Sequence, residues 1–165
     1  MKLIEEEVSS QIALMDYFPL YMLFAKEEPD LLHHYNIIKR PTGCFEFACD
    51  YETNRLLRIS LVLAGSYSII HKSLTLDDCP LGSFTLDLPA ITETEVFQSI
   101  IYDDGVEVVL SDKEPVTFLG SGDMRIGLSA SGDIVRVFAL NMSTEEIAHT
   151  KEEIEAIANE DQISR

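Results

Sequence analysis

The chain is short of basic residues. Its 165 residues include 12 Lys and Arg against 29 Asp and Glu, a formal net charge of −17 at pH 7. A surface with so few cations repels phosphate, so nucleic acid and anionic membranes are poor partners. The same charge attracts basic proteins and polyamines, although acidity can also serve only to keep a protein soluble.

Long hydrophobic runs are missing as well. The apolar stretch at residues 59–63 is broken by Ser60, and no run approaches the ~20 residues needed to cross a bilayer. Glu5, Glu6 and Glu7 are the opposite of the basic start of a secretory or mitochondrial leader, so we expect a cytoplasmic protein. The length, with 46% hydrophobic and 25% charged residues, predicts a single globular domain over residues 1–165.

Cysteines are few, and their number is odd. Cys44, Cys49 and Cys79 cannot all pair within one chain, and in a reducing compartment they are expected to be free thiols. Cys44 and Cys49 are five residues apart, so on one strand their side chains point to opposite faces and cannot share a metal ion.

Catalytic signatures are also absent from the sequence. There is no phosphate-binding Gly-x-x-x-x-Gly-Lys motif and no Gly-x-Ser-x-Gly nucleophile turn. His33 and His34 are adjacent and would diverge on a helix, and the neighbouring Asp77 and Asp78 make Cys79 a poor thiolate. We therefore predict a protein that is not an enzyme and that has no cofactor and no metal.

The N-terminal quarter predicts helices. Apolar residues recur at spacings of four, four and three over residues 3–15, at Ile4, Val8, Ile12 and Met15. Two prolines then open apolar segments at residues 20–26 and 30–33, since proline is tolerated in the first turn of a helix. Three N-terminal helices are expected.

Beyond Pro41 the hydrophobic period changes to two. Residues 45–51 and 57–63 alternate across a short link, which predicts an antiparallel hairpin. Residues 94–102 fit either helix or strand. Ser143 followed by Glu146 is a capping box, which predicts a C-terminal helix. Further strands are expected at residues 67–76, 84–88, 106–110, 116–119, 124–128 and 134–140.

This order of elements predicts an α+β fold. We expect a mainly antiparallel sheet of about six or seven strands, flanked by N-terminal helices and one C-terminal helix. The helices would cover one face of the sheet through inward-facing apolar residues at Ile4, Val8, Ile12, Ile147 and Ile154. No internal repeat and no linker-like segment divides the chain.

Acidic residues concentrate between residues 93 and 133. This segment contains nine Asp and Glu residues but only two basic residues, Lys113 and Arg125, which gives it a net charge of −7. Charge of this kind can simply discourage aggregation at a sheet edge. The alternative is a docking surface for a basic protein, and the residues predicted to form it are Asp77, Asp78, Asp103, Asp104, Glu107, Asp112 and Glu114.

A small, acidic, single-domain protein without catalytic motifs fits the profile of bacterial immunity proteins, which cover the active site of a cognate toxin. A nuclease toxin carries a basic cleft, and complementary charge speeds association. We therefore predict a protein that neutralises a basic partner, a toxin domain. Two other hypotheses are a secretion chaperone or adaptor with an exposed apolar groove, and a small enzyme with an unrecognised carboxylate site in a deep pocket.

Overall fold

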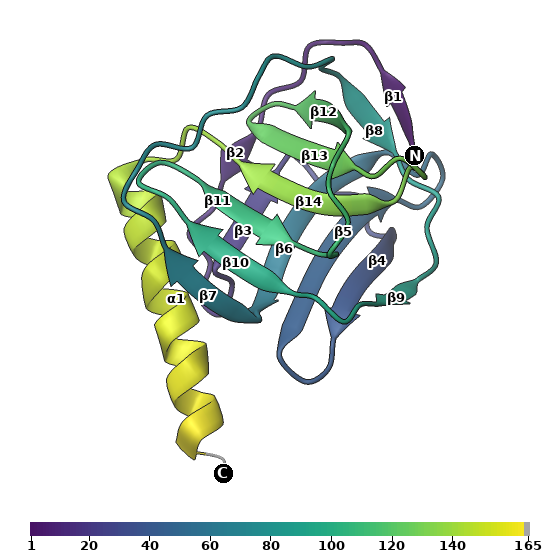
Figure 1. Ribbon diagram of the computed structural model, residues 1–165. Coiled ribbons are helices and arrows are strands. Elements are labelled where there is room, and N and C mark those ends of the chain that lie inside the picture. The colour runs from purple at the N-terminus through teal and green to yellow at the C-terminus, as the bar shows by residue number, and fades with distance from the viewer. Residues whose placement is uncertain (164–165) are drawn as a thin grey trace.

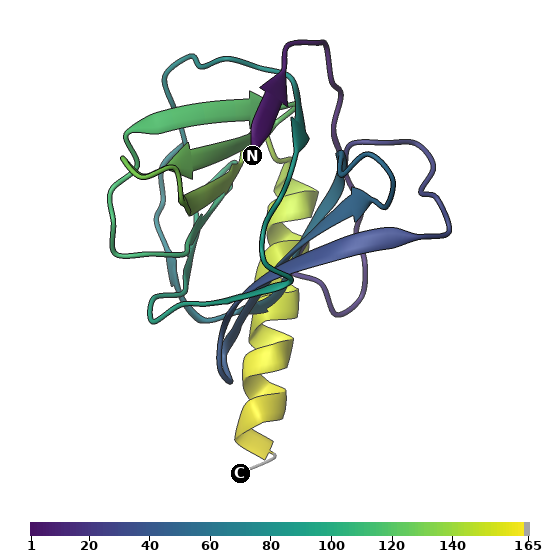
Figure 2. The same ribbon diagram turned by 90° about the vertical axis from the view of Figure 1, so that its right-hand side faces the viewer.

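Two six-stranded sheets face each other and enclose the core, and a helix lies along one side of them (Figures 1 and 2). The computed structural model describes the backbone of residues 1–163 and the side chains of residues 1–160. This part of the chain forms fourteen strands in three sheets and one helix, α1 (Thr144–Ile163). The third sheet is a single pair, β1 (Lys2–Ile4) with β8 (Ser83–Thr85).

The sheet that we call the N-terminal sheet has the strand order β2 (Gln11–Ile12), β3 (Leu20–Leu23), β6 (Leu56–Ala64), β5 (Gly43–Asp50), β4 (Leu32–Lys39) and β9 (Ile91–Glu93). Neighbouring strands are antiparallel except β9, which runs parallel to β4. Phe45 and Phe47 of β5 face Leu61 and Ile59 of β6, and all four side chains are completely buried. They form the centre of the core on this side.

The C-terminal sheet has the order β12 (Thr117–Ser121), β13 (Met124–Leu128), β14 (Ile134–Ala139), β11 (Val106–Val109), β10 (Gln98–Ile101) and β7 (Ser66–Ile69). Its neighbours are antiparallel except β7, which runs parallel to β10. Inward-facing and outward-facing residues alternate along these strands. The inward-facing residues Val106, Met124, Ile126 and Val137 are buried against the N-terminal sheet. Their polar neighbours lie on the outer face.

Gly65 carries the chain from one sheet to the other. β6 ends at Ala64 and β7 begins at Ser66, so a single residue makes the corner. The φ angle of Gly65 is 67°, in the left-handed region, and a Cβ atom there would lie 2.5 Å from the carbonyl oxygen of Phe97. Glycine is required because any other residue would meet both backbone strain and a steric clash.

The predicted start of α1 is confirmed. The Ser143 hydroxyl accepts a hydrogen bond from the Glu146 amide at 3.2 Å, and the Glu146 carboxylate accepts one from the Ser143 amide at 2.9 Å. Ile147 and Ile154 are buried as expected, and the Thr150 hydroxyl donates to the Pro19 carbonyl at 2.7 Å. The second half of α1 extends past the sheets (Figures 1 and 2).

The predicted α+β fold with N-terminal helices is wrong. Residues 3–15 contain β1 and β2, residues 20–26 contain β3, and residues 30–33 lead into β4. Ile4 and Met15 are exposed and Val8 is only partly buried, so of the predicted apolar stripe only Ile12 packs against the core. In β3 burial has a period of two, with Leu20 and Met22 inside, because pairing with β6 overrides the helix preference of leucine and methionine.

Most of the strands expected after Pro41 are confirmed. The predicted hairpin is β5 and β6, and residues 94–102, which fitted helix or strand, contain β10. The strand predicted over residues 67–76 is too long, because β7 ends at Ile69. The strand predicted over residues 84–88 corresponds only to the short β8. No helix in the described part of the chain is long and apolar enough to span a membrane.

Candidate functional site

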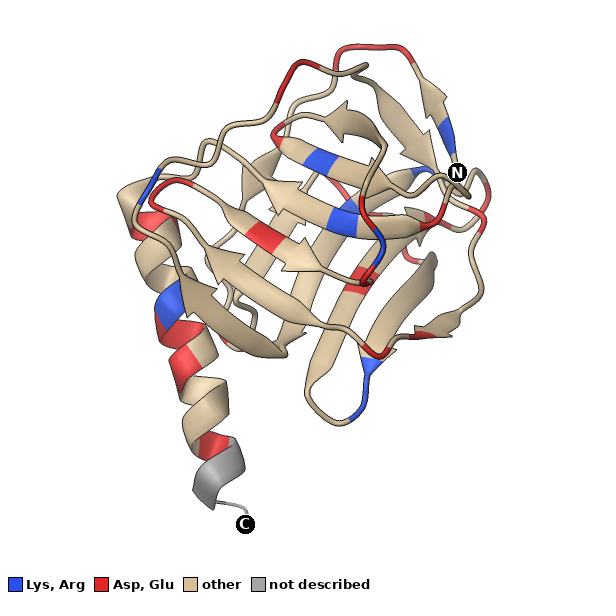
Figure 3. Ribbon diagram, viewed as in Figure 1, with Lys and Arg blue, Asp and Glu red and all other residues tan. Residues whose placement is uncertain are grey.

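The seven carboxylates predicted to bind a partner lie at four places between β7 and β12. They are Asp77 and Asp78 in the β7–β8 loop, Asp103 and Asp104 in the β10–β11 turn, Glu107 within β11, and Asp112 and Glu114 in the loop after β11. The strand β11 separates the turn before it from the loop after it, so the set is not one compact patch. Acidic residues also occur on many other loops and along α1 (Figure 3).

Two of the seven hold structural contacts. Asp104 accepts a hydrogen bond from the Leu74 amide at 2.7 Å and so fixes the segment that follows β7. Glu107 is largely buried, accepts a hydrogen bond from the Tyr102 hydroxyl at 2.8 Å, and lies 3.6 Å from Nε of Arg136. Burial, together with the bond to Glu107, raises the pKa of Tyr102 to about 12. These two carboxylates stabilise the fold and are poorly placed for a partner.

A cleft of about 350 Å³ opens beside the loop that carries Asp112 and Glu114. Its apolar lining consists of Met1, Ile37, Leu88, Pro89, Leu110 and Ile134. The remaining lining residues are Thr92, Glu93, Thr94, Ser111, Gly132 and Asp133. The cleft therefore lies between β4 and β9 of the N-terminal sheet and the ends of β11 and β14 in the C-terminal sheet. We call this feature the acidic cleft.

Two exposed carboxylates border the acidic cleft, and each has an exposed basic partner. Glu93 lies 3.2 Å from Nε of Arg40, and Asp133 lies 3.0 Å from Nζ of Lys113. All four side chains are more than half exposed, so both pairs are weak and are screened by salt. Hydrogen bonds from Lys113 and Ser131 lower the pKa of Asp133 and keep it ionised.

Two polar residues that line the acidic cleft, Thr94 and Ser111, already have partners within the chain. The Thr94 hydroxyl donates to the Leu110 carbonyl at 2.7 Å. The Ser111 hydroxyl accepts a hydrogen bond from the Lys113 amide at 3.2 Å, and the Ser111 carbonyl accepts one from Nη1 of Arg136 at 2.7 Å. The floor therefore suits hydrocarbon, since a polar group buried there would lose its water without gaining a new partner.

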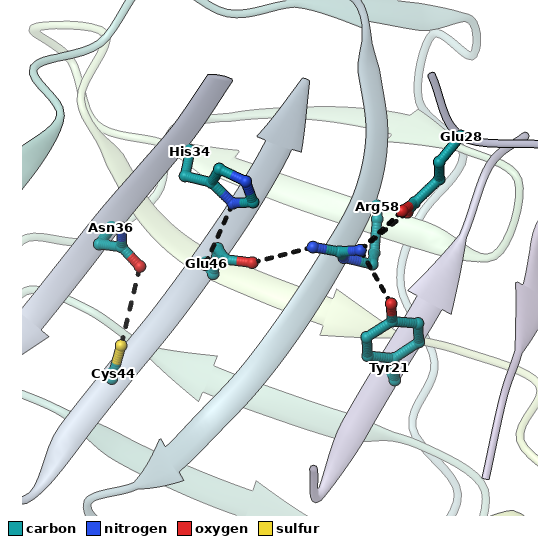
Figure 4. A network of polar contacts seen from close by, with 7 residues as sticks. All are labelled: Tyr21, Glu28, His34, Asn36, Cys44, Glu46 and Arg58. Carbon is teal, nitrogen blue, oxygen red and sulfur yellow. Dashed lines mark hydrogen bonds and ion pairs between the residues drawn. The ribbon is translucent and has the colours of Figure 1, made fainter. Parts of the chain in front are cut away.

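A separate polar network lies on the outer face of the N-terminal sheet (Figure 4). Nη1 of Arg58 donates to both carboxylate oxygens of Glu28 at 2.9 Å and to the Tyr21 hydroxyl at 2.8 Å. Nη2 of Arg58 donates to Glu46 at 3.2 Å, and Glu46 also lies 3.3 Å from Nδ1 of His34. Burial alone would lower the pKa of Arg58, but its acidic and tyrosine neighbours outweigh burial and raise it.

This network is best explained as structural. Its acidic members Glu28 and Glu46 both pair with Arg58, and together the contacts join β3, β5 and β6 to the segment before β4. Nε of Arg58 and the Ser60 hydroxyl are buried without a hydrogen-bond partner in the described chain.

The cysteines lack the environment of a reactive thiolate. Cys49 is completely buried on the inner face of β5, and burial raises its pKa to about 12. Cys44 is half-buried on the outer face, as the sequence predicted, and burial also raises the pKa of Cys44 and of Cys79. No group of three His, Cys, Asp or Glu residues that could hold a metal ion occurs among the described side chains.

Sequence reasoning identified the acidic segment but not the cleft that part of this segment lines. Glu93 and Asp133 belong to the segment of charge −7 but were not among the predicted contact residues. The cleft exists because β9 pairs with β4 in parallel and so places Thr92 and Glu93 opposite the β13–β14 turn. No local sequence signal indicates that pairing, since β9 is three residues long and fully exposed.

Neither the known protein-family models nor the curated proteins include a match to this chain. The candidate site is therefore defined by the chain's own residues. It consists of the acidic cleft and the adjacent exposed carboxylates of Asp112 and Glu114.

Proposed function

We propose that this protein binds a basic protein partner through the acidic cleft and through Asp112 and Glu114, and inhibits it as an immunity protein inhibits a toxin. The supporting observation is that the acidic cleft combines an apolar lining with the exposed carboxylates of Glu93 and Asp133 and lies beside the loop that carries Asp112 and Glu114. Protein interfaces commonly combine an apolar, desolvated centre with a polar rim.

The charge of the whole chain supports the same proposal. A net charge of −17 produces a long-range field that attracts a basic surface and raises the rate of encounter. Asp77, Asp78 and Asp103 are exposed and add to this field without lying at the cleft. A nuclease toxin fits this proposal well, because the site that binds its phosphate substrate is itself basic.

The test measures association with a captured toxin domain at several salt concentrations. The informative variant is Asp112→Lys with Glu114→Lys, because neither carboxylate accepts a hydrogen bond in the described part of the chain. Glu114 only approaches Arg136 at 4.0 Å, so the change should not disturb the fold. The matched control is Glu152→Lys with Glu155→Lys, which changes the net charge equally on the exposed side of α1. Reversal of Asp104 or Glu107 would be uninformative, because both stabilise the fold.

We expect the cleft-side reversal to slow association about tenfold or more at low salt and to reduce its salt dependence. The α1 control should change the association rate only slightly, and both variants should keep the native far-UV spectrum. A toxin domain whose binding responds neither to salt nor to the change at residues 112 and 114 would contradict the proposal. The acidity would then act only on solubility.

A further inference from the structure

We infer that the acidic cleft receives one large apolar side chain of the partner, and that basic residues on either side of it bind Glu93 and Asp133. This inference rests on the proposed function, because it names the kind of partner segment that the same site recognises. The occupant is thus a short exposed segment with an aromatic or long aliphatic residue between lysine or arginine residues.

The floor of the cleft selects an apolar side chain. Accessible hydrocarbon surface comes from Met1, Leu88, Pro89 and Ile134, while Ile37 and Leu110 are buried. The hydroxyls of Thr94 and Ser111 are engaged within the chain. A cation pushed into this floor would lose hydration and find no new ligand. The volume of about 350 Å³ is near the lower limit of roughly 300 Å³ for small-molecule pockets, so one large side chain has room in it.

The rim of the cleft accommodates basic neighbours. Glu93 and Asp133 are paired with Arg40 and Lys113, and all four side chains are exposed. Exchange of one exposed cation for another conserves the number of ion pairs, so little is lost when a partner's lysine or arginine takes over. The released Arg40 and Lys113 return to water. Burial of the apolar side chain then supplies the net driving force.

Capped tripeptides test this specificity directly. Isotope-labelled protein is titrated with Ac-Arg-Phe-Arg-NH2, with Ac-Arg-Ala-Arg-NH2 and with Ac-Gln-Phe-Gln-NH2, and the amide signals of Thr94, Ser111 and Gly132 are followed by NMR. The first peptide should bind most tightly. Loss of the phenylalanine should weaken binding at least fivefold, whereas loss of the two charges should weaken it less and mainly at low salt, because each new ion pair replaces an existing one. Equal binding of the alanine peptide, or no shift at these amides, would overturn the inference.

Variants link the peptide site to the partner. Thr92→Trp should fill the cleft from an exposed position on β9 and weaken the first peptide about tenfold or more. Thr117→Trp is the control, because it places the same side chain on the exposed start of β12. Glu93→Gln with Asp133→Asn should weaken the same peptide while leaving the fold unchanged, and Glu52→Gln at an exposed turn should not.

The inference and the proposed function can fail separately. A toxin domain that depends on Asp112 and Glu114 but binds the Thr92→Trp variant normally would overturn the inference and support the function. Peptide binding at the cleft with no inhibition of any basic toxin domain would support the inference as a recognition site and contradict the function.

Discussion

Replacement of Arg58 by methionine should destabilise the protein by about 3 kcal/mol. The Arg58 guanidinium binds Glu28, Glu46 and Tyr21 at the same time, and its side chain is 11% exposed. Methionine keeps most of the length and the apolar contacts of the arginine stem. The loss therefore reports on the charge and its hydrogen bonds.

The magnitude follows from how deeply each partner is buried. Removing one member of a buried ion pair costs about 3–5 kcal/mol, because the remaining charge is left without a partner. Glu46 and Glu28 are 22% and 28% exposed, so water can partly reach both once Arg58 is gone, which places the cost at the lower end. Glu28→Gln leaves Arg58 bound to Glu46 and Tyr21 and should cost only about 1 kcal/mol.

Urea unfolding followed by far-UV circular dichroism measures these differences. The slope of the unfolding free energy against urea concentration should be the same for each variant. Arg55→Met is the matched control, because Arg55 pairs with Glu6 at 2.9 Å but the two side chains are 48% and 38% exposed. An exposed pair of this kind contributes less than about 1 kcal/mol. If Arg58→Met costs no more than Arg55→Met, the network in Figure 4 does not stabilise the sheet as we argue.

Three further predictions concern single groups. Cys49, completely buried with its pKa raised to about 12, should react with a thiol reagent at pH 8 only on unfolding, and rapid modification of all three native thiols would contradict this. The pKa of Tyr102 is raised to about 12 in the folded state from 10.0, so its contribution to stability should be complete below pH 10 and be lost between pH 10 and 12. Tyr102→Phe should reduce that alkaline loss in unfolding experiments. Ser143→Ala should lower stability by about 1 kcal/mol in urea through loss of the helix cap, and an unchanged midpoint would argue against the cap.

The parts of the fold that could be predicted from the sequence are those with local pairing. β5 with β6 and β13 with β14 are hairpins whose partners are adjacent in the chain, so alternation and turn residues were sufficient. The N-terminal strands have distant partners instead. β3 pairs with β6, whose central residues lie about 40 positions later, and β1 pairs with β8 about 80 positions later. The spacing of their apolar residues favoured helix, and nothing in the local sequence reveals the distant partners that make them strands.

The candidate site divides in the same way. Charge counting found the acidic segment, since composition needs no knowledge of the fold. It could not separate the structural carboxylates of Asp104 and Glu107 from exposed ones, because their partners Leu74 and Arg136 are about 30 residues away. Nor could it find a cleft whose walls come from two different sheets.

The two parallel strand pairs interlock the two halves of the chain. A cut in the exposed loop that follows β7 would leave β9 of the second fragment beside β4 of the first, and β7 of the first beside β10 of the second. Each fragment would thus complete a sheet that belongs mainly to the other. We expect the two fragments to reassemble when produced together and to co-purify, which would make this fold suitable as a split reporter; fragments that fold stably apart would contradict the idea.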